Sequence, residues 1–267
     1  MSGRNSLVKR NSITRESGVH GTQWQMFHGG YFSDPAVANP FIEIVNEAVA
    51  LSKPQIIVDL GGGTGFILRE LIKHSIDPGI RLVNLDLSRK QLEVTCDYRI
   101  FPVRRAMMGF RRADASKEAD RFLFIMRSAL HYFGRDGLMP FLHHLRSQMK
   151  KSEFFVHQTA CFDRITDARC LNRLYECMGT NKWYPTKKYL CGCLEKAGWS
   201  ITSVASAPML ALTSDDLRKR YRLHKHRLAE IRDEVSGCCD GKKNVFIPSP
   251  DGFCAYLHYR IFTCIAK

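Results

Sequence analysis

Gln55-Ile-Ile-Val-Asp-Leu-Gly-Gly-Gly-Thr-Gly65 is the stretch that decides the fold of this chain. Ile56 to Val58 are consecutive apolar residues, which predict a short buried strand that Asp59 closes. Four glycines follow within five positions, and glycine lets the backbone turn sharply and lets a ligand approach the main chain. An apolar pattern at helical spacing begins at Phe66. Because the first N–H groups of a helix suit a polar or anionic ligand, the strand, loop and helix together predict a nucleotide-type cofactor site.

The glycine spacing discriminates between two classes of cofactor. The dinucleotide fingerprint requires glycine at the first, third and sixth places of the loop, but the sixth place counted from Gly61 is Phe66. The pattern Asp-x-Gly-x-Gly-x-Gly fits instead, and it resembles the first motif of class I S-adenosylmethionine (SAM)-dependent methyltransferases. In that family the acidic residue orients the loop and the amino-acid end of the cofactor. The resemblance implies that the SAM-binding loop consists of Asp59, Gly61, Gly62, Gly63 and Gly65.

A second acid follows the loop at a suitable distance. Residues 81–86 form the expected second strand, and Asp86 lies 21 residues beyond Gly65. This spacing places a carboxylate at the carboxyl end of the neighbouring strand, where it accepts hydrogen bonds from both ribose hydroxyls. We expect Leu87 to lie against the adenine. We also expect a third strand at residues 110–115, and the family resemblance implies that Asp114 and Ala115 lie beside the adenine amino group.

The segment after the expected fourth strand, residues 120–126, holds the candidate chemistry. Residues 127–142 resemble the motif that follows strand four in small-molecule methyltransferases. We expect Arg127 and Ser128 to contact the cofactor. In the plant-type O-methyltransferase group the matching histidine is a general base, so the resemblance makes His131 the candidate catalytic residue. The alternative is that His131 has only a packing role.

Aromatic residues are candidates for the acceptor side of the site. Trp24, Phe27 and Tyr31 cluster before the first strand, either as a lid or as a hydrophobic clamp that only seals the domain. Tyr132 follows the candidate base. Tyr175 belongs to an expected helix at residues 163–182, and in the resembled family the insertion after strand five lies over the acceptor pocket.

The expected fold class is α/β. It is a doubly wound, mostly parallel seven-stranded sheet (the Rossmann-like methyltransferase fold) whose last strand, residues 252–265, is antiparallel, with helical N-terminal and post-strand-five insertions. We expect an N-terminal helical cap at residues 1–53 and a methyltransferase domain at residues 54–267. That domain would contain the lid insertion at about residues 163–182 and a basic helical insertion at about residues 213–236.

The composition limits the partners and the compartment. A net charge of +14 favours anionic partners, either a substrate with a phosphate or carboxylate group or a nucleic acid. The chain has no run of about 18 apolar residues and no apolar signal core, which predicts a cytoplasmic protein without a membrane partner. The cysteines lack paired zinc spacing, so we expect no metal site.

The sequence therefore predicts an enzyme that transfers the methyl group of SAM to an O-, N- or S-nucleophile of a small molecule and releases S-adenosylhomocysteine (SAH). It would be a monomer or a homodimer. One alternative is an RNA methyltransferase that uses the arginines of residues 99–112 and 215–232 as a phosphate track. Others are a SAM-binding protein without turnover and a nicotinamide-dependent oxidoreductase. The motifs of exocyclic-amine and cytosine-C5 methyltransferases are absent from the sequence, which disfavours those chemistries.

Overall fold

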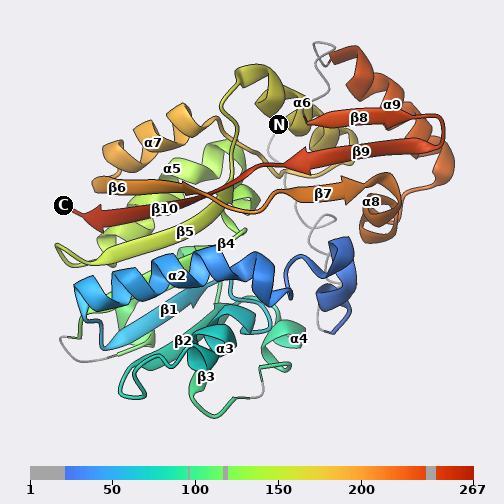
Figure 1. Cartoon of the computed structure of the whole chain (residues 1–267). Coiled ribbons are helices and arrows are strands. Elements are labelled where there is room, and N and C mark those ends of the chain that lie inside the picture. Colours follow the sequence, from blue (N-terminus) through green and yellow to red (C-terminus); the bar gives the residue numbers. More distant parts are fainter. Residues whose placement is uncertain (1–21, 96, 117–119, 239–244) are drawn as a thin grey trace.

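The computed structural model of the 267-residue chain describes residues 22–95, 97–116, 120–238 and 245–267 (Figure 1). Within these ranges, nothing is described of the side chains of residues 22–25 and 238. The side chain of Trp24, a predicted lid residue, therefore lies outside the described part. The segment η1, Thr22–Gly30, contains Trp24 and has a kink at Phe27–Gly29.

The main sheet has seven strands in the order β3-β2-β1-β4-β5-β10-β6. Its strands are β1 Ile56–Leu60, β2 Arg81–Asp86, β3 Ile100–Arg104, β4 Phe122–Arg127, β5 Phe154–Ala160, β6 Trp199–Ser206 and β10 Tyr259–Ala266. Only β10 runs antiparallel to its neighbours β5 and β6 among the described strands of this sheet. The predicted doubly wound sheet with an antiparallel last strand is confirmed.

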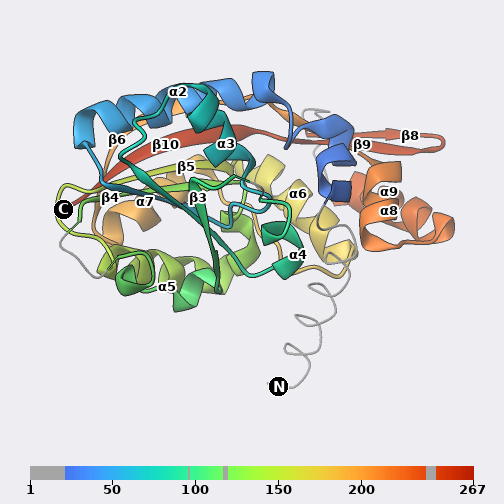
Figure 2. The same cartoon turned by 90° about the horizontal axis from the view of Figure 1, so that it is seen from below.

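Helices cover both faces of this sheet, so its central strands are apolar on both faces (Figure 2). On one face lie α2 Pro35–Ser52 and α3 Phe66–Lys73, which pack with Ile57 of β1. On the other face lie α5 Gly134–Ser147 and α7 Lys187–Lys196, which pack with Ile56 and Val58 of β1. The alternation of residues 56–58 between the two faces follows from the pleat of the strand.

The third strand lies elsewhere than predicted. It is β3, Ile100–Arg104, whereas residues 110–115 lie in and around the short turn η3, Arg112–Asp114. Pro102 is tolerated in β3 because this strand is at the edge of the sheet. Arg112 instead forms a two-pronged ion pair with the buried Glu153, at 2.8 and 2.7 Å, which ties the turn to the start of β5.

A second sheet extends the fold beyond the sequence prediction. It has three antiparallel strands in the order β7-β9-β8, which are β7 Leu210–Thr213, β8 Phe246–Ser249 and β9 Gly252–Leu257. The final strand predicted at residues 252–265 is therefore wrong as one element. It divides at His258, where β9 in the small sheet is followed by β10 in the main sheet (Figure 1).

Three helices pack with the second sheet into a separate apolar cluster. They are α6 Ile165–Cys177, α8 Ser214–Tyr221 and α9 Lys225–Cys238, and the remaining short segments are α4 Arg89–Leu92, η2 Met107–Gly109 and η4 Leu130–Phe133. The basic helical insertion predicted at about residues 213–236 consists of two helices, α8 and α9, because Arg222 adopts a left-handed conformation at φ 53° and ends α8.

Across the described ranges, no helix has both the length and the apolar character needed to cross a bilayer. The described side chains also contain no group of three or more His, Cys, Asp or Glu residues arranged to hold a metal ion. The division of domains at residue 53, the cytoplasmic location and the oligomeric state stay predictions.

Candidate active site

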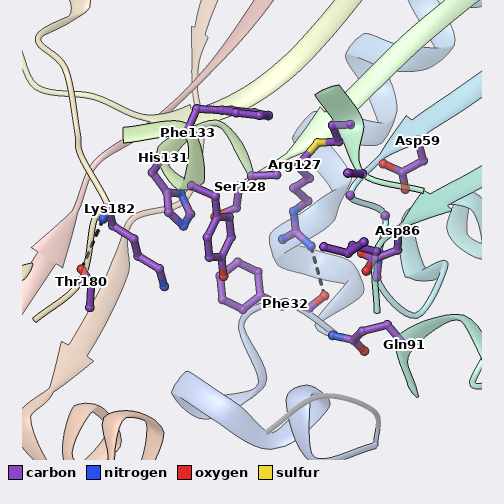
Figure 3. Close-up of a pocket in the computed structure, with 18 of the residues that line it drawn as sticks. Phe32, Asp59, Asp86, Gln91, Arg127, Ser128, His131, Phe133, Thr180 and Lys182 are labelled. Carbon is purple, nitrogen blue, oxygen red and sulfur yellow. Dashed lines mark hydrogen bonds between the residues drawn. The ribbon is translucent and has the colours of Figure 1, made fainter. Parts of the chain in front are cut away.

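A cavity of about 580 Å³ lies at the carboxyl ends of β1 and β4. This is where the strand order reverses, since β1 lies between β2 and β4, and open α/β sheets bind ligands at such a point. The glycine loop and the residues that follow β4 line one part of the cavity. Thr180 and Lys182 lie on the side of the cavity opposite Asp59 and Asp86 (Figure 3). The strands β7 and β9 and the helix α8 also contribute lining residues, so the second sheet forms part of the wall.

The glycine loop has a conformation that other residues tolerate poorly. Gly61, Gly63 and Gly65 have φ of 71°, 57° and 74°, in the left-handed region where a Cβ is strained. A Cβ on Gly62 would lie 2.4 Å from Asn84 Oδ1 and 2.5 Å from an Asp59 carboxylate oxygen. The loop therefore requires glycine for its backbone angles and for close packing on two polar side chains.

Asp86 is fixed at the edge of the cavity by main-chain donors. The Gly63 N–H donates to Asp86 Oδ2 at 3.0 Å, and the Ser88 N–H donates to Oδ1 at 2.7 Å. The Asn84 side-chain amide donates to the Gly63 carbonyl at 3.0 Å, which holds the loop from the neighbouring strand. Leu87 lies beside Asp86, lines the cavity and is 57% exposed.

Asp59 is a buried carboxyl group that lines the cavity. Its Oδ2 has no hydrogen-bond partner among the described atoms. The pKa of Asp59 is raised to about 7, mainly by burial and also by the negative charge of Asp86, while the positive charge of Arg127 acts in the opposite direction. A carboxyl group with this pKa responds to any positive charge placed in the cavity.

Arg127 and Ser128 follow β4 and contact the N-terminal and C-terminal segments. The Arg127 guanidinium donates to the carbonyls of Phe32 and Tyr31, at 3.2 and 3.3 Å, and burial lowers its pKa. Its Nε is buried and has no partner among the described atoms. Ser128 has a φ of 56°, and its hydroxyl lies 2.5 Å from the hydroxyl of the buried Tyr259.

His131 lies in the cavity wall between aromatic rings. Its ring stacks on Tyr184 with a centroid distance of 5.2 Å and lies against Tyr132 at 4.4 Å. The His131 carbonyl accepts from the Trp183 N–H at 3.2 Å, which ties η4 to the segment before α7. His131 is thus both packed and next to the cavity, and its catalytic role stays a prediction.

The structure brings most of the predicted residues together. Those that line the cavity are Asp59, Gly61, Gly62, Gly63, Asp86, Leu87, Arg127, Ser128, His131, Tyr132 and Tyr175. Gly65 does not line the cavity and is the N-cap residue of α3. Tyr31 is buried behind the wall, where it stacks on Tyr259, and Phe27 does not line the cavity.

The two residues expected beside the adenine amino group do not line the cavity. Asp114 accepts from the Arg111 N–H at 2.7 Å and pairs with Arg105 at 3.2 Å, while Ala115 is buried in the core. This follows from the displaced third strand. The wall near the glycine loop is formed instead by Gln91 and by residues 105–108. Residues 105–108 directly follow β3 as the structure has it.

Sequence reasoning also missed Lys182 and Arg220, which line the cavity opposite the glycine loop and are only 6% and 5% exposed. Nothing in the sequence separates them from the other Lys and Arg residues of the chain. Their positions depend on contacts made by the second sheet and by α8. Many other cations of α8 and α9 pair with nearby acids at the surface, as Arg218 and Lys219 do with Asp215 at 2.8 and 2.7 Å.

Neither a protein-family model nor a curated protein sequence matches this chain. Solved structures do match it in fold. A Bacillus halodurans protein described provisionally as a methyltransferase has a TM-score of 0.63 at 13% identity, covering 84% of this chain and 98% of its own. The Burkholderia thailandensis 1,6-didemethyltoxoflavin-N1-methyltransferase, solved with that compound and SAH bound, has a TM-score of 0.56 at 13% identity over 100% and 91%.

A third example is the geranyl diphosphate C-methyltransferase of Streptomyces coelicolor, solved with Mg²⁺, geranyl diphosphate and SAH. It has a TM-score of 0.52 at 12% identity, covering 86% of this chain and 79% of its own. At these identities the similarity establishes the fold. The chain has the Rossmann-like fold of class I SAM-dependent methyltransferases.

Proposed function

We propose that this protein is a SAM-dependent methyltransferase that acts on a small molecule and releases SAH. The observation that supports this most is the hydrogen bond from the Gly63 N–H to Asp86, because it brings the glycine loop and the expected ribose acceptor into one site. The structural neighbours solved with SAH support the same donor. The fold alone hosts many functions, so the site supplies the argument.

The residues of the cavity fit this donor. The left-handed loop of Gly61, Gly62 and Gly63 exposes its main chain where a bulky nucleoside must approach closely. Asp59 presents a buried oxygen without a partner, which suits the ammonium of the donor's amino-acid end. Arg127 places a buried guanidinium beside the same region, which suits the donor carboxylate. Asp86 would accept from the ribose hydroxyls.

SAM, when bound, supplies a methyl group on a positively charged sulfonium. The chain's own residues would align the acceptor with that methyl and exclude water from both. Alignment of this kind is worth about 7–11 kcal/mol of barrier in well-oriented systems. The enclosure of the cavity by the second sheet and by residues 180–184 serves this purpose.

His131 is our candidate for proton removal from an acceptor hydroxyl. It lines the cavity within the segment that follows β4, and its ring is held by Tyr184 and Tyr132. A positioned histidine of this kind contributes typically about 10²–10⁴-fold to a rate. A thiolate, a carboxylate or a free amine would not need this base.

The experiment is calorimetric titration of SAM, SAH and NAD into the protein, followed by an SAH-release assay over a small-molecule acceptor panel. We expect SAM and SAH to bind one-to-one, NAD not to bind, and an acceptor of the panel to stimulate SAH release. Failure of SAM and SAH to bind, or binding of NAD in their place, would contradict the proposal.

A further inference from the structure

The carboxylates that line the cavity lie at one of its ends. Among the described lining residues they are Asp59 and Asp86, both at the end formed by the glycine loop, and Arg105 and Arg127 give that end cations as well. Lys182 and Arg220 line the opposite end, and both are almost fully buried. Figure 3 shows Asp59 and Asp86 on one side of the cavity and Lys182 with His131 on the other. The donor, with its sulfonium, ammonium and carboxylate, suits the end that holds Asp59, Asp86 and Arg127. The end that holds Lys182 and Arg220 is therefore left for the acceptor.

The two cations converge on Tyr132. Arg220 donates from Nη2 to the Tyr132 hydroxyl at 3.1 Å, and the Lys182 ammonium lies 4.6 Å from the centre of the same ring. Lys182 also donates to the Tyr221 hydroxyl at 2.8 Å. These contacts hold both positive charges next to one aromatic side chain that lines the cavity.

The pKa of His28 is affected by the positive charges of the same two residues, Lys182 and Arg220. The pKa of His28 is lowered to about 3, mainly by burial and also by the positive charges of Arg220 and Lys182. The imidazole is therefore neutral at physiological pH, and its Nε2 lies 3.1 Å from Arg220 Nη1, where it can accept a hydrogen bond. The buried positive charges of Lys182 and Arg220 repel each other strongly because the local dielectric constant is low. An anion between them would be strongly attracted to both.

The walls around the cations are apolar and aromatic. The second sheet contributes Leu210, Leu212 and Leu257, while Tyr175 and Tyr184 lie on the side of α6 and α7. A ligand at this end thus meets charge at one point and hydrocarbon or ring surface elsewhere. Such a surface matches a molecule with one anionic group on an apolar body.

We infer that the methyl acceptor carries an oxyanion group, a carboxylate or a phosphate, on an aromatic or aliphatic body, and that Lys182 and Arg220 bind this oxyanion. The inference rests on the proposed function, since it identifies the second substrate of the same site. Guanidinium and ammonium groups are the usual partners of both oxyanions, and Arg binds them with two parallel hydrogen bonds.

The test uses four probes with one ring system: 1-naphthoate with its neutral partner 1-naphthamide, and 1-naphthyl phosphate with its neutral partner 1-naphthol. Binding of each to SAH-saturated protein is measured by fluorescence titration. We expect at least one anionic probe to bind about tenfold or more tightly than its neutral partner. The two pairs separate a carboxylate site from a phosphate site.

Variants assign that preference to the two cations. Lys182→Met and Arg220→Gln should each reduce the affinity for the anionic probe about tenfold and leave the neutral probe unchanged. Lys182→Arg and Arg220→Lys keep the charge and should retain part of the preference, which also distinguishes lost charge from lost folding. Arg218→Gln, at a half-exposed position of α8 where the side chain pairs with Asp215, and Lys188→Met, at an exposed position of α7, remove one positive charge each outside the cavity. Both variants should bind the anionic and the neutral probes like the wild type.

Equal binding of the anionic and neutral probes to wild-type protein would overturn the inference, and so would a preference that survives in both Lys182→Met and Arg220→Gln. Calorimetry with SAH on the same samples separates this result from the proposed function. SAH binding without an anion preference would overturn only the acceptor class. An anion preference without SAH binding would support the basic site and contradict the methyltransferase proposal.

Discussion

The backbone N–H of Gly63 donates a hydrogen bond to Oδ2 of Asp86 at 3.0 Å, which joins the loop after β1 to the acid after β2. One carboxylate thus stabilises the glycine loop and remains at the edge of the cavity for a ligand. The two functions are linked, since a change of Asp86 affects both loop geometry and ligand binding.

Asp86→Ala should therefore weaken SAH binding about tenfold or more. A hydrogen bond to a charged group contributes about 1.5–3 kcal/mol, and this substitution removes at least one to the ligand. The measurement is calorimetry with SAH. Asp77→Ala, in the exposed turn before β2, removes a carboxylate that only accepts from the Gly79 N–H and should bind SAH like the wild type. An unchanged dissociation constant for Asp86→Ala would refute the role of Asp86.

Gly62→Ala should reduce both thermal stability and SAH affinity. Its Cβ would lie 2.4 Å from Asn84 Oδ1, so the loop or the two polar side chains must move. Gly192→Ala is the matched control, because Gly192 lies within α7 and a Cβ there meets nothing within 4 Å. Replacing a helical glycine by alanine stabilises by about 0.5–1 kcal/mol, so the melting temperature of the control should rise. A Gly62→Ala protein that melts and binds SAH like the wild type contradicts the packing argument.

SAM binding should strengthen as the pH rises through about 7. The Asp59 carboxyl has a pKa of about 7 in the folded protein, so it is protonated below that pH and negative above it. Only the negative form attracts the ammonium and sulfonium of the donor. Calorimetry with SAM between pH 5.5 and 8.5 measures the effect, and Asp59→Asn should flatten the profile. A wild-type profile as flat as that of Asp59→Asn would contradict this account.

The same group should affect the stability of the ligand-free protein in the opposite direction. Burial raises the pKa of Asp59 from its usual 3.8 to about 7, so the folded state binds this proton more tightly than the unfolded state does. The stability that Asp59 contributes therefore falls as the pH rises from about 4 to about 7. The free energy of unfolding of the wild type and of Asp59→Asn is measured in urea between about pH 4 and about pH 7. It should depend less on pH in Asp59→Asn than in the wild type. A free energy of unfolding that depends more strongly on pH in Asp59→Asn than in the wild type would contradict the pKa assigned to Asp59.

His131→Ala should lower the methyl-transfer rate while leaving SAH affinity unchanged. The loss should be about 10²-fold or more with a hydroxyl acceptor, because a general base contributes on that scale. The measurement is SAH release with the acceptor found in the panel. His143→Ala, on the exposed face of α5, is the control and should keep full activity. Full activity of His131→Ala would mean that the ring only packs against Tyr184.

The parts of the fold that local sequence determines were predicted. The glycine loop follows β1 and Asp86 ends β2, and these neighbouring parallel strands are joined through α3 alone. Their spacing in the sequence is therefore enough to place the loop and the acid together. The antiparallel last strand of the main sheet was also predicted, although its start was placed too early. The α/β class followed from strands that alternate with helices.

The parts that depend on distant contacts were not predicted. The third strand was predicted at residues 110–115, whereas β3 contains Pro102, which is tolerated in a strand because β3 lies at the edge of the sheet. The alternation over residues 252–265 is continuous, so it did not reveal that the chain changes sheets at His258. Lys182 and Arg220 are buried by elements far away in the sequence, and their residue types gave no signal of it.

The most direct test of the central claim is a crystal structure of the protein grown with saturating SAH. The account predicts density for SAH over the Gly61–Gly65 loop, with both ribose hydroxyls within hydrogen-bond distance of Asp86 and the sulfur directed toward His131. Density for SAH at another place, or a cavity that stays free of SAH at saturation, would contradict it.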